Sequence, residues 1–179
     1  MSEQAAPSYL EKLRGVKALS GLPYPSWQEI LISGVGGLII IALLQLVNTE
    51  WELVKTFIVP FGATAVLVFA APAAPFSQPR NIVGGHLIAG LTGIVVYTIF
   101  KESTWWTLAL ANGFAIALMV ATKTVHPPAG ATALLPVLNQ ITGLEWLVEP
   151  VLVGCLFFVV VGVLLNNVWP KRRYPAFWL

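Results

Sequence analysis

Long apolar runs alternate with short polar stretches along this chain. Four runs contain no Asp, Glu, Lys or Arg, and they cover residues 30–47, 82–100, 105–122 and 151–168. As a helix, the first run would be about 27 Å long at ~1.5 Å per residue, close to the ~30 Å hydrocarbon thickness of a bilayer. Runs of this length and composition predict helices that cross a membrane. We therefore expect an all-α membrane protein.

Two shorter apolar segments, 57–71 and 128–138, carry a repeated motif. The first copy is Pro60–Ala65 (PFGATA) and the second is Pro128–Ala133 (PAGATA). Small residues of this kind often only pack helices together in membranes. Each copy begins with Pro and lies in the second segment of its half, which favours an internal repeat. The pattern predicts two broken or half-length helices that face one another inside the membrane.

Charged residues predict how the segments are oriented. Basic turns or tails at Lys12–Lys17, Arg80, Lys123 and Lys171–Arg173 alternate with acidic or neutral stretches that carry Glu50 and Glu52, Lys101 and Glu102, and Glu145 and Glu149. Cytoplasmic loops of membrane proteins are enriched in Lys and Arg, so six crossings would put the basic turns and both termini in the cytoplasm. The seven Trp residues lie at segment ends or in the tail, as in an aromatic belt: Trp27, Trp51, Trp105, Trp106, Trp146, Trp169 and Trp178.

The predicted architecture is a single transmembrane domain over residues 27–169, between cytoplasmic tails at 1–26 and 170–179. Six segments form a 3+3 inverted repeat with halves at about 27–100 and 105–169, because three segments per half reverse the direction of the second half. The second segment of each half is short or broken. The alternative is four full spans with two re-entrant half-helices.

Composition agrees with a membrane protein and narrows the chemistry. The 179 residues are 57% hydrophobic and 10% charged, with a mean hydropathy of +0.80, whereas soluble domains average about 25% charged residues. A net charge of +2 without an aromatic-rich basic patch argues against nucleic acid. One Cys, two His and no Asp leave too few ligands for a metal hydrolase. We expect no enzyme activity, no metal and no cofactor.

The repeated motif is the candidate binding site. A helix N-terminus carries unpaired N–H groups and about half a positive charge. The small residues there would leave these groups open, and two Thr would add hydroxyl donors, so two facing ends predict a cradle for a small anion. The alternative for each Thr is a bond to its own helix. The expected anion-binding residues are Gly62, Ala63, Thr64, Gly130, Ala131 and Thr132, with His126 beside them at the inner mouth.

Five further polar residues are predicted at the mouth of the site. His126 either gates the inner mouth and accepts a proton, or only orients Pro127 and Pro128; for His86 a structural role is favoured. Arg80 and Lys123 would anchor the boundary and raise the local anion concentration. The fifth residue, Asn81, is expected to cap the third of the six segments, the helix predicted at 82–100. Asn112, in the middle of a span, would bond between helices or line the path.

Four blocks in order resemble the HPP family of integral membrane proteins: 61–65 (FGATA), 78–81 (QPRN), 84–86 (GGH) and 126–133 (HPPAGATA). The resemblance covers about 27–169. The family is usually described as having four membrane helices, and its cyanobacterial and plastid members are linked to nitrite transport. The resemblance therefore implies nitrite as the first substrate, in a bacterial plasma membrane or, for a plant protein, a plastid envelope.

From these features we expect a channel or carrier for a small anion such as nitrite, embedded in the lipid bilayer. We also expect a homo-oligomer, because a chain this small exposes much apolar surface. Two alternatives stay open, a channel for a neutral small solute and a non-transporting membrane subunit.

Overall fold

The computed structural model describes residues 24–48 and 58–179, and the regular structure of these residues is helical. Two short elements join the α-helices, the 3₁₀ turn η3 (Pro75–Ser77) and the π-helical turn η4 (Leu147–Leu152). The prediction of an all-helical protein is confirmed for this part of the chain. The predicted N-terminal tail up to residue 23 and the loop with Glu50 and Glu52 lie outside the described residues. The α-helices are α2 (Trp27–Asn48), α3 (Ile58–Ala70), α4 (Pro79–Phe100), α5 (Trp105–Ala121), α6 (Ala129–Leu138) and α7 (Val153–Asn167).

The helices have two lengths. Three described stretches are long and apolar enough to cross a membrane: Trp27–Leu46, Pro79–Phe100 and Leu147–Asn167. Three shorter apolar stretches, Val59–Ala70, Trp105–Ala121 and Ala129–Leu138, complete the set. The six predicted segments therefore correspond to six helices, and both copies of the repeated motif lie on short ones. The inverted repeat stays a prediction.

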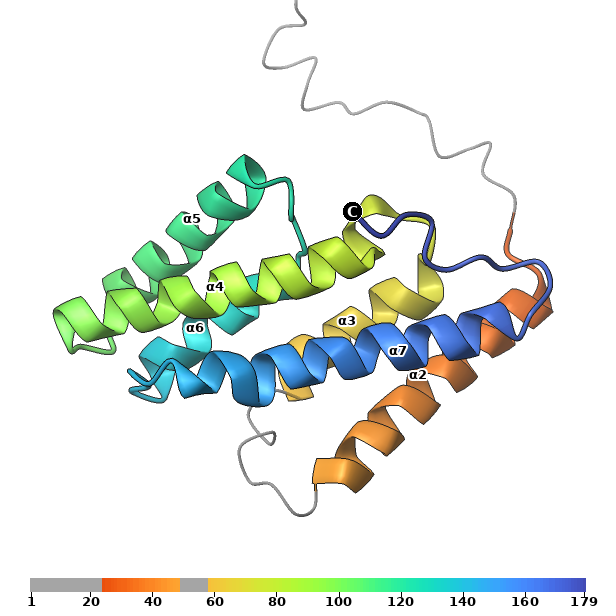
Figure 1. The fold of residues 1–179 in the computed structure, drawn as a ribbon, viewed down its shortest axis with the longest axis horizontal. Helices are drawn as coiled ribbons and strands as arrows, with labels where there is room; N and C mark the ends of the chain where they lie inside the picture. The colour runs from red at the N-terminus through yellow and green to blue at the C-terminus, as the bar shows by residue number, and fades with distance from the viewer. Residues whose placement is uncertain (1–23, 49–57) are drawn as a thin grey trace, which may run out of the picture.

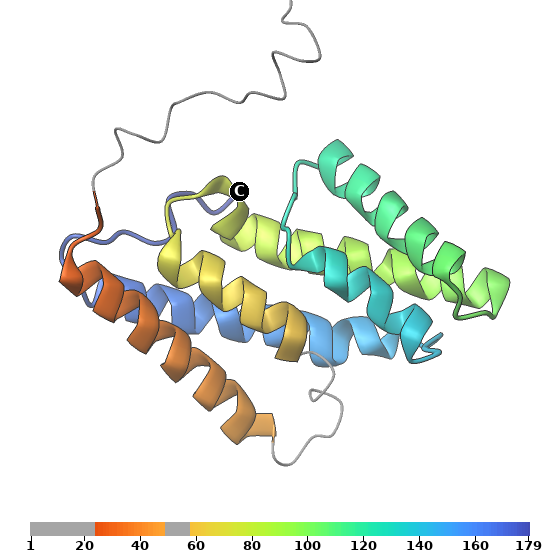
Figure 2. The same cartoon turned by 180° about the vertical axis from the view of Figure 1, so that it is seen from behind.

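The two short motif helices start next to each other and then diverge. Figures 1 and 2 show that α3 and α6 both begin in the middle of the molecule and run toward opposite ends. The long helices α4 and α7 run in opposite directions and lie side by side across the middle of the molecule. In α4, 56% of the most apolar stretch is buried, against 39% in α7 and 17% in α2. Helix α4 is therefore the central element around which the short helices pack.

Close approach between α4 and α6 depends on a glycine. A Cβ on Gly93 would overlap the carbonyl oxygen of Ala133 and would lie 3.0 Å from the ring of Pro136. Gly154 of α7 has the same function for α3, since a Cβ there would overlap the ring of Phe61. Small residues let helix backbones approach closely in membranes. These two glycines bring the motif helices against the long ones.

Two helix boundaries differ from the predicted ones. Helix α4 begins at Pro79 rather than Ile82, because Pro at the first helical position loses no hydrogen bond. Its N-cap is Gln78, without a side-chain capping bond, so the prediction that Asn81 caps this helix is wrong. The last helical stretch begins at Leu147 rather than Val151, with non-helical backbone angles at Glu149.

Polar contacts gather the basic turns of the described residues at one end of the molecule, and the predicted basic stretch Lys12–Lys17 lies outside those residues. The Arg80 guanidinium donates to the carbonyl oxygen of Thr122 (3.0 Å), which joins the start of α4 to the turn after α5. Arg172 of the C-terminal tail donates to Phe69 O at the end of α3 (2.9 Å) and to the Ser33 hydroxyl of α2 (2.8 Å). The Tyr174 hydroxyl donates to Ser77 O (2.8 Å), and burial raises the pKa of this phenol.

Candidate functional site

The two motif threonines and both histidines of the chain meet in one buried cluster. Thr64, His86, His126 and Thr132 are each 0% exposed. The Thr64 hydroxyl lies 3.2 Å from His86 Nε2 and 3.0 Å from His126 Nε2. His86 Nδ1 lies 2.7 Å from the Thr132 hydroxyl, and His126 Nδ1 lies 2.7 Å from the carbonyl oxygen of Phe76. We call these four side chains the His–Thr chain.

Each member of the His–Thr chain comes from a different element. Thr64 lies on α3, His86 on α4, His126 on the segment between α5 and α6, and Thr132 on α6. The repeated sequence brings its two threonines to opposite sides of one imidazole, that of His86. The two copies, far apart in sequence, therefore contribute to a single polar cluster.

The segment 122–128 reaches the cluster because α4 has little side chain where the two meet. A Cβ on Gly85 would lie 2.7 Å from the Cβ of His126, and one on Gly84 would lie 2.7 Å from a methyl carbon of Thr124. The Asn81 amide donates to Val125 O (2.9 Å) and holds the segment from the same helix. Asn81 thus fixes the entry to the second motif rather than the start of α4.

The partners assign a direction to every hydrogen bond when both imidazoles are neutral. A carbonyl oxygen only accepts, so His126 Nδ1 carries the hydrogen and its Nε2 is an acceptor. The Thr64 hydroxyl therefore donates to His126, and it accepts from His86 Nε2–H. His86 Nδ1 is then an acceptor, to which the Thr132 hydroxyl donates. The two histidines are thus assigned to opposite tautomers.

Thr64 also has a second acceptor within reach. Its hydroxyl lies 3.1 Å from the carbonyl oxygen of Pro60, one turn back on α3. A hydroxyl has one hydrogen, so it cannot donate to Pro60 and to His126 at once. If it donates to Pro60 and both imidazole contacts are kept as hydrogen bonds, both Nε2 atoms have to donate to it, and His126 then carries two N–H groups and a positive charge.

Aromatic rings close the cluster on one side. The rings of His86 and His126 are 4.9 Å apart, edge to face. Phe61, the second residue of the first motif, lies 5.4 Å from the His86 ring and stacks on Phe158 of α7 at 4.7 Å. Phe61 therefore lies between the His86 imidazole and helix α7.

The backbone donors expected at the motif are engaged in this arrangement. On α6, the N–H groups of Ala129, Gly130 and Ala131 donate to the carbonyl oxygens of the three residues before the helix, at 2.9–3.1 Å. On α3, Gly62 and Ala63 lie in the second turn, where an N–H has a carbonyl four residues earlier. The polar groups that the motif turns toward its neighbours are the hydroxyls of Thr64 and Thr132.

The other predicted mouth residues lie around this cluster rather than in it. The Arg80 guanidinium donates a hydrogen bond to the Thr122 carbonyl oxygen, in the turn after α5. Lys123, in the same turn, is exposed and has a left-handed backbone φ of 57°. The Asn112 side-chain oxygen is buried with no hydrogen-bond partner, and a Cβ on Gly130 would lie 3.2 Å from it. Sequence reasoning missed Phe76, whose carbonyl has no signal in the sequence.

Among the described residues, the buried polar side chains are hydroxyls, amides and imidazoles, without a carboxylate, lysine or arginine. Glu29 and Glu149 lie inside helical elements but are exposed. The interior around the His–Thr chain therefore carries no permanent charge.

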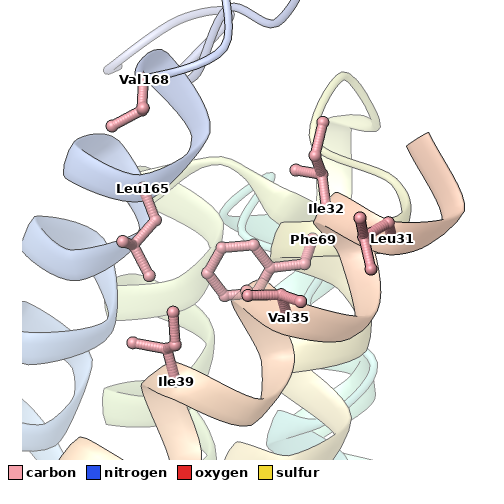
Figure 3. Close-up of a pocket in the computed structure, with 8 residues that line it drawn as sticks. Leu31, Ile32, Val35, Ile39, Phe69, Leu165 and Val168 are labelled. Atoms are coloured by element: carbon pink, nitrogen blue, oxygen red, sulfur yellow. The ribbon is translucent and has the colours of Figure 1, made fainter. Parts of the chain in front are cut away.

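A groove between α2, α3 and α7 differs in character from the cluster. Figure 3 shows the ring of Phe69 between the aliphatic side chains of α2 and those of α7. Its lining offers no hydrogen-bonding side chain and suits lipid chains rather than a polar solute. The residues that line it are Leu31, Ile32, Val35, Gly36, Ile39, Phe69, Leu165 and Val168.

Comparison with known proteins identifies relatives for almost the whole chain. The family model for the HPP transmembrane region matches residues 22–175. A Dictyostelium discoideum protein described as a transmembrane protein is 38% identical over 161 residues, and a second one is 30% identical over 179. The matches cover 86% and 95% of this chain, but only 50% and 63% of those proteins. No solved structure matches.

Proposed function

This chain belongs to the HPP transmembrane family, and from that premise we propose that it is a channel or carrier for a small inorganic anion, with nitrite as the first candidate. The observation that carries the proposal is the meeting of both motif copies in the His–Thr chain. The Thr64 and Thr132 hydroxyls and the imidazole N–H groups bond protein acceptors in the closed cluster, and once neighbouring elements separate they become the donors that a small planar anion needs. An interior without buried carboxylates does not repel such an anion.

The anion site lies between the starts of α3 and α6 in this proposal. The contacts come from the Thr64 and Thr132 hydroxyls and from His126, with Gly62, Ala63, Gly130 and Ala131 providing a backbone without bulky side chains. The two short helices run apart from this point (Figures 1 and 2). Such a pair is what an inverted repeat with halves 27–100 and 105–169 would produce at the membrane midplane.

Transport through this site requires motion. All four side chains of the His–Thr chain are 0% exposed, so a solute reaches them only when neighbouring elements separate. The segment 122–128 is the natural moving part, because it has no helical hydrogen-bond ladder of its own. Arg80 and Lys123, at the same end, would concentrate anions at the mouth. We place this end, with both termini, in the cytoplasm because it gathers the basic turns.

Flux into liposomes tests the proposal. Liposomes that contain the purified protein are expected to take up nitrite down its gradient faster than empty liposomes, and other small anions are expected to compete. Val at both positions 64 and 132 should reduce nitrite uptake more than either single Thr→Val change, whereas Ser at both should preserve it. Uptake no faster than in empty liposomes, for nitrite and for other small anions, would contradict the proposal.

A neutral solute is the second candidate, and Asn112 favours it. The buried Asn112 side-chain oxygen has no hydrogen-bond partner, so it can accept a hydrogen bond from water or ammonia, whereas it repels an anion. Flux that ignores both membrane voltage and competing anions would support this candidate. A non-transporting membrane subunit would instead co-purify with another protein and give no flux alone.

A further inference from the structure

We propose that the His–Thr chain takes up one proton for each anion, on His126 Nε2, so that transport is coupled to the proton gradient. This inference rests on the proposed anion transport and names the second transported species. It starts from the unbroken sequence of bonds from Thr132 through His86 and Thr64 to His126 and Phe76 O.

The Thr64 hydroxyl makes proton uptake possible without a lost hydrogen bond. In the neutral chain it donates to His126 Nε2 (3.0 Å). When a proton from the aqueous phase binds that nitrogen, the hydroxyl turns to Pro60 O (3.1 Å) and accepts from both imidazoles. All donors still have acceptors. The step moves one proton onto one nitrogen, and the reverse step releases it to the opposite aqueous phase.

The chain ends close to the surface. His126 Nδ1–H donates to the carbonyl oxygen of Phe76, a residue that is 43% exposed in the turn between α3 and α4. Thr132, at the other end, is 0% exposed on α6. The bonds therefore connect a surface turn with the start of the second motif helix.

The spacing of the imidazoles limits the count to one proton. With ring centroids 4.9 Å apart in a buried setting, two positive imidazoles would repel each other strongly, so one proton excludes the second. A single positive imidazole beside the bound anion gives a neutral pair, which costs less to bury than the anion alone. A proton and an anion therefore favour each other's binding.

The surroundings provide few competing titratable groups. The short helices α3 and α6 and helix α5 carry none. Helix α4 adds Arg80, which bonds Thr122 O, and Tyr97. Lys123 precedes His126 and is exposed, Glu149 of η4 is exposed, and the Cys155 thiol of α7 contacts Ile82 O. No described carboxylate is buried beside the imidazoles to take the proton instead.

Nitrite and proton movements recorded in the same liposomes test the coupling. The membrane potential is clamped at zero with potassium and valinomycin, internal pH is read with a trapped dye, and empty liposomes correct for nitrous acid that crosses lipid unaided. We expect one proton to enter with each nitrite, and an inward proton gradient to drive nitrite above its external concentration. Thr64→Val should reduce this proton-driven accumulation about tenfold, whereas Thr64→Ser should stay within about twofold of the wild type.

The possible outcomes separate the two proposals. Nitrite entry that leaves internal pH unchanged at zero potential, and that follows voltage when potassium and valinomycin set other potentials, would overturn proton coupling but leave anion transport intact. Absence of nitrite flux above empty liposomes would overturn both. If Thr64→Val does not fold, the proton-to-nitrite ratio of the wild type and of Thr64→Ser still decides, because a ratio near zero contradicts the proposal.

Discussion

The two copies of the repeated motif have almost the same sequence but different positions in the His–Thr chain. Thr64, in the first copy, contacts both imidazoles and the Pro60 carbonyl. Thr132, in the second copy, contacts His86 Nδ1 and ends the chain. The repeat brings two equivalent hydroxyls to one site. Because both histidines lie next to Thr64, the Thr64 hydroxyl is the junction that connects the two imidazoles. The two copies are nearly identical in sequence, but their threonines make different contacts.

The residue that differs between the copies explains part of this asymmetry. Phe61 fills the space between α3 and α7, where it stacks on Phe158. Its counterpart, Ala129, is buried in a cluster of small and apolar residues with Ala115 and Met119 of α5. The small residue lets α5 and α6 pack closely, and the segment between them carries His126 into the site.

The largest loss of stability is expected from a substitution that pushes α4 away from α6, the helix that carries the second copy of the motif. A Cβ in Gly93→Ala would overlap a backbone carbonyl of α6, at Ala133, and a backbone atom cannot move aside. We expect a loss of about 1–3 kcal/mol of stability, measured by thermal unfolding in detergent. Gly154→Ala should cost less, because it meets only the ring of Phe61.

The control for these substitutions is Gly113→Ala on α5, where a Cβ meets nothing within 4 Å. It should be neutral or up to about 1 kcal/mol more stable, since Ala favours helix more than Gly. Equal effects at Gly93 and Gly113 would mean that α4 and α6 do not approach as described.

The next largest effect is a difference in stability between the variants Thr64→Val and Thr132→Val. Thr64→Val removes two hydrogen bonds of the cluster, those to His86 Nε2 and His126 Nε2, whereas Thr132→Val removes one, the bond to His86 Nδ1. Each lost hydrogen bond costs about 0.5–1.5 kcal/mol, so Thr64→Val should be the more destabilising by about that amount.

Unfolding curves of the matched Thr→Val and Thr→Ser variants measure this difference. Ser retains the hydroxyl at each position, so both Ser variants should stay closer to the wild type. If the two Val variants are equally stable, Thr64 is not the junction of the chain.

A smaller loss of stability is expected when the segment 122–128, which leads into the second copy of the motif, loses its contact with α4. Asn81→Ala removes the bond to Val125 O, so we expect a loss of about 1 kcal/mol and slower nitrite uptake. Asn139→Ala is the matched control, because its amide bonds Leu135 O on its own helix and the residue is exposed. Similar uptake by both variants would argue that Asn81 does not position His126.

The smallest effect is expected at Asn112. Its oxygen has no partner in the structure, so Asn112→Leu should change stability by less than about 1 kcal/mol. A drop in solute flux at unchanged stability would identify Asn112 as lining of the path. Unchanged solute flux in Asn112→Leu would mean that Asn112 only packs beside Gly130 and does not line the path.

The sequence predicted the helices well because their apolar runs are long and bounded by charge. It also singled out Thr64, Thr132, His86 and His126, although it favoured a structural role for His86. It did not predict that the histidines join the threonines, since side-chain partners depend on how helices pack. The expected backbone donors of Gly130 and Ala131 are engaged because the tight turn after His126 provides carbonyls next to them.

The tautomers of the two histidines test the His–Thr chain most directly. The chain holds only these two histidines, so ¹⁵N NMR of the histidine-labelled protein in bilayers reports them alone. They are assigned by ¹³C-labelled Gly or Val, because Gly85 precedes one and Val125 the other. At neutral pH, we predict Nδ1–H for His126 and Nε2–H for His86. The same tautomer at both positions would contradict the directed chain that joins the two motif copies.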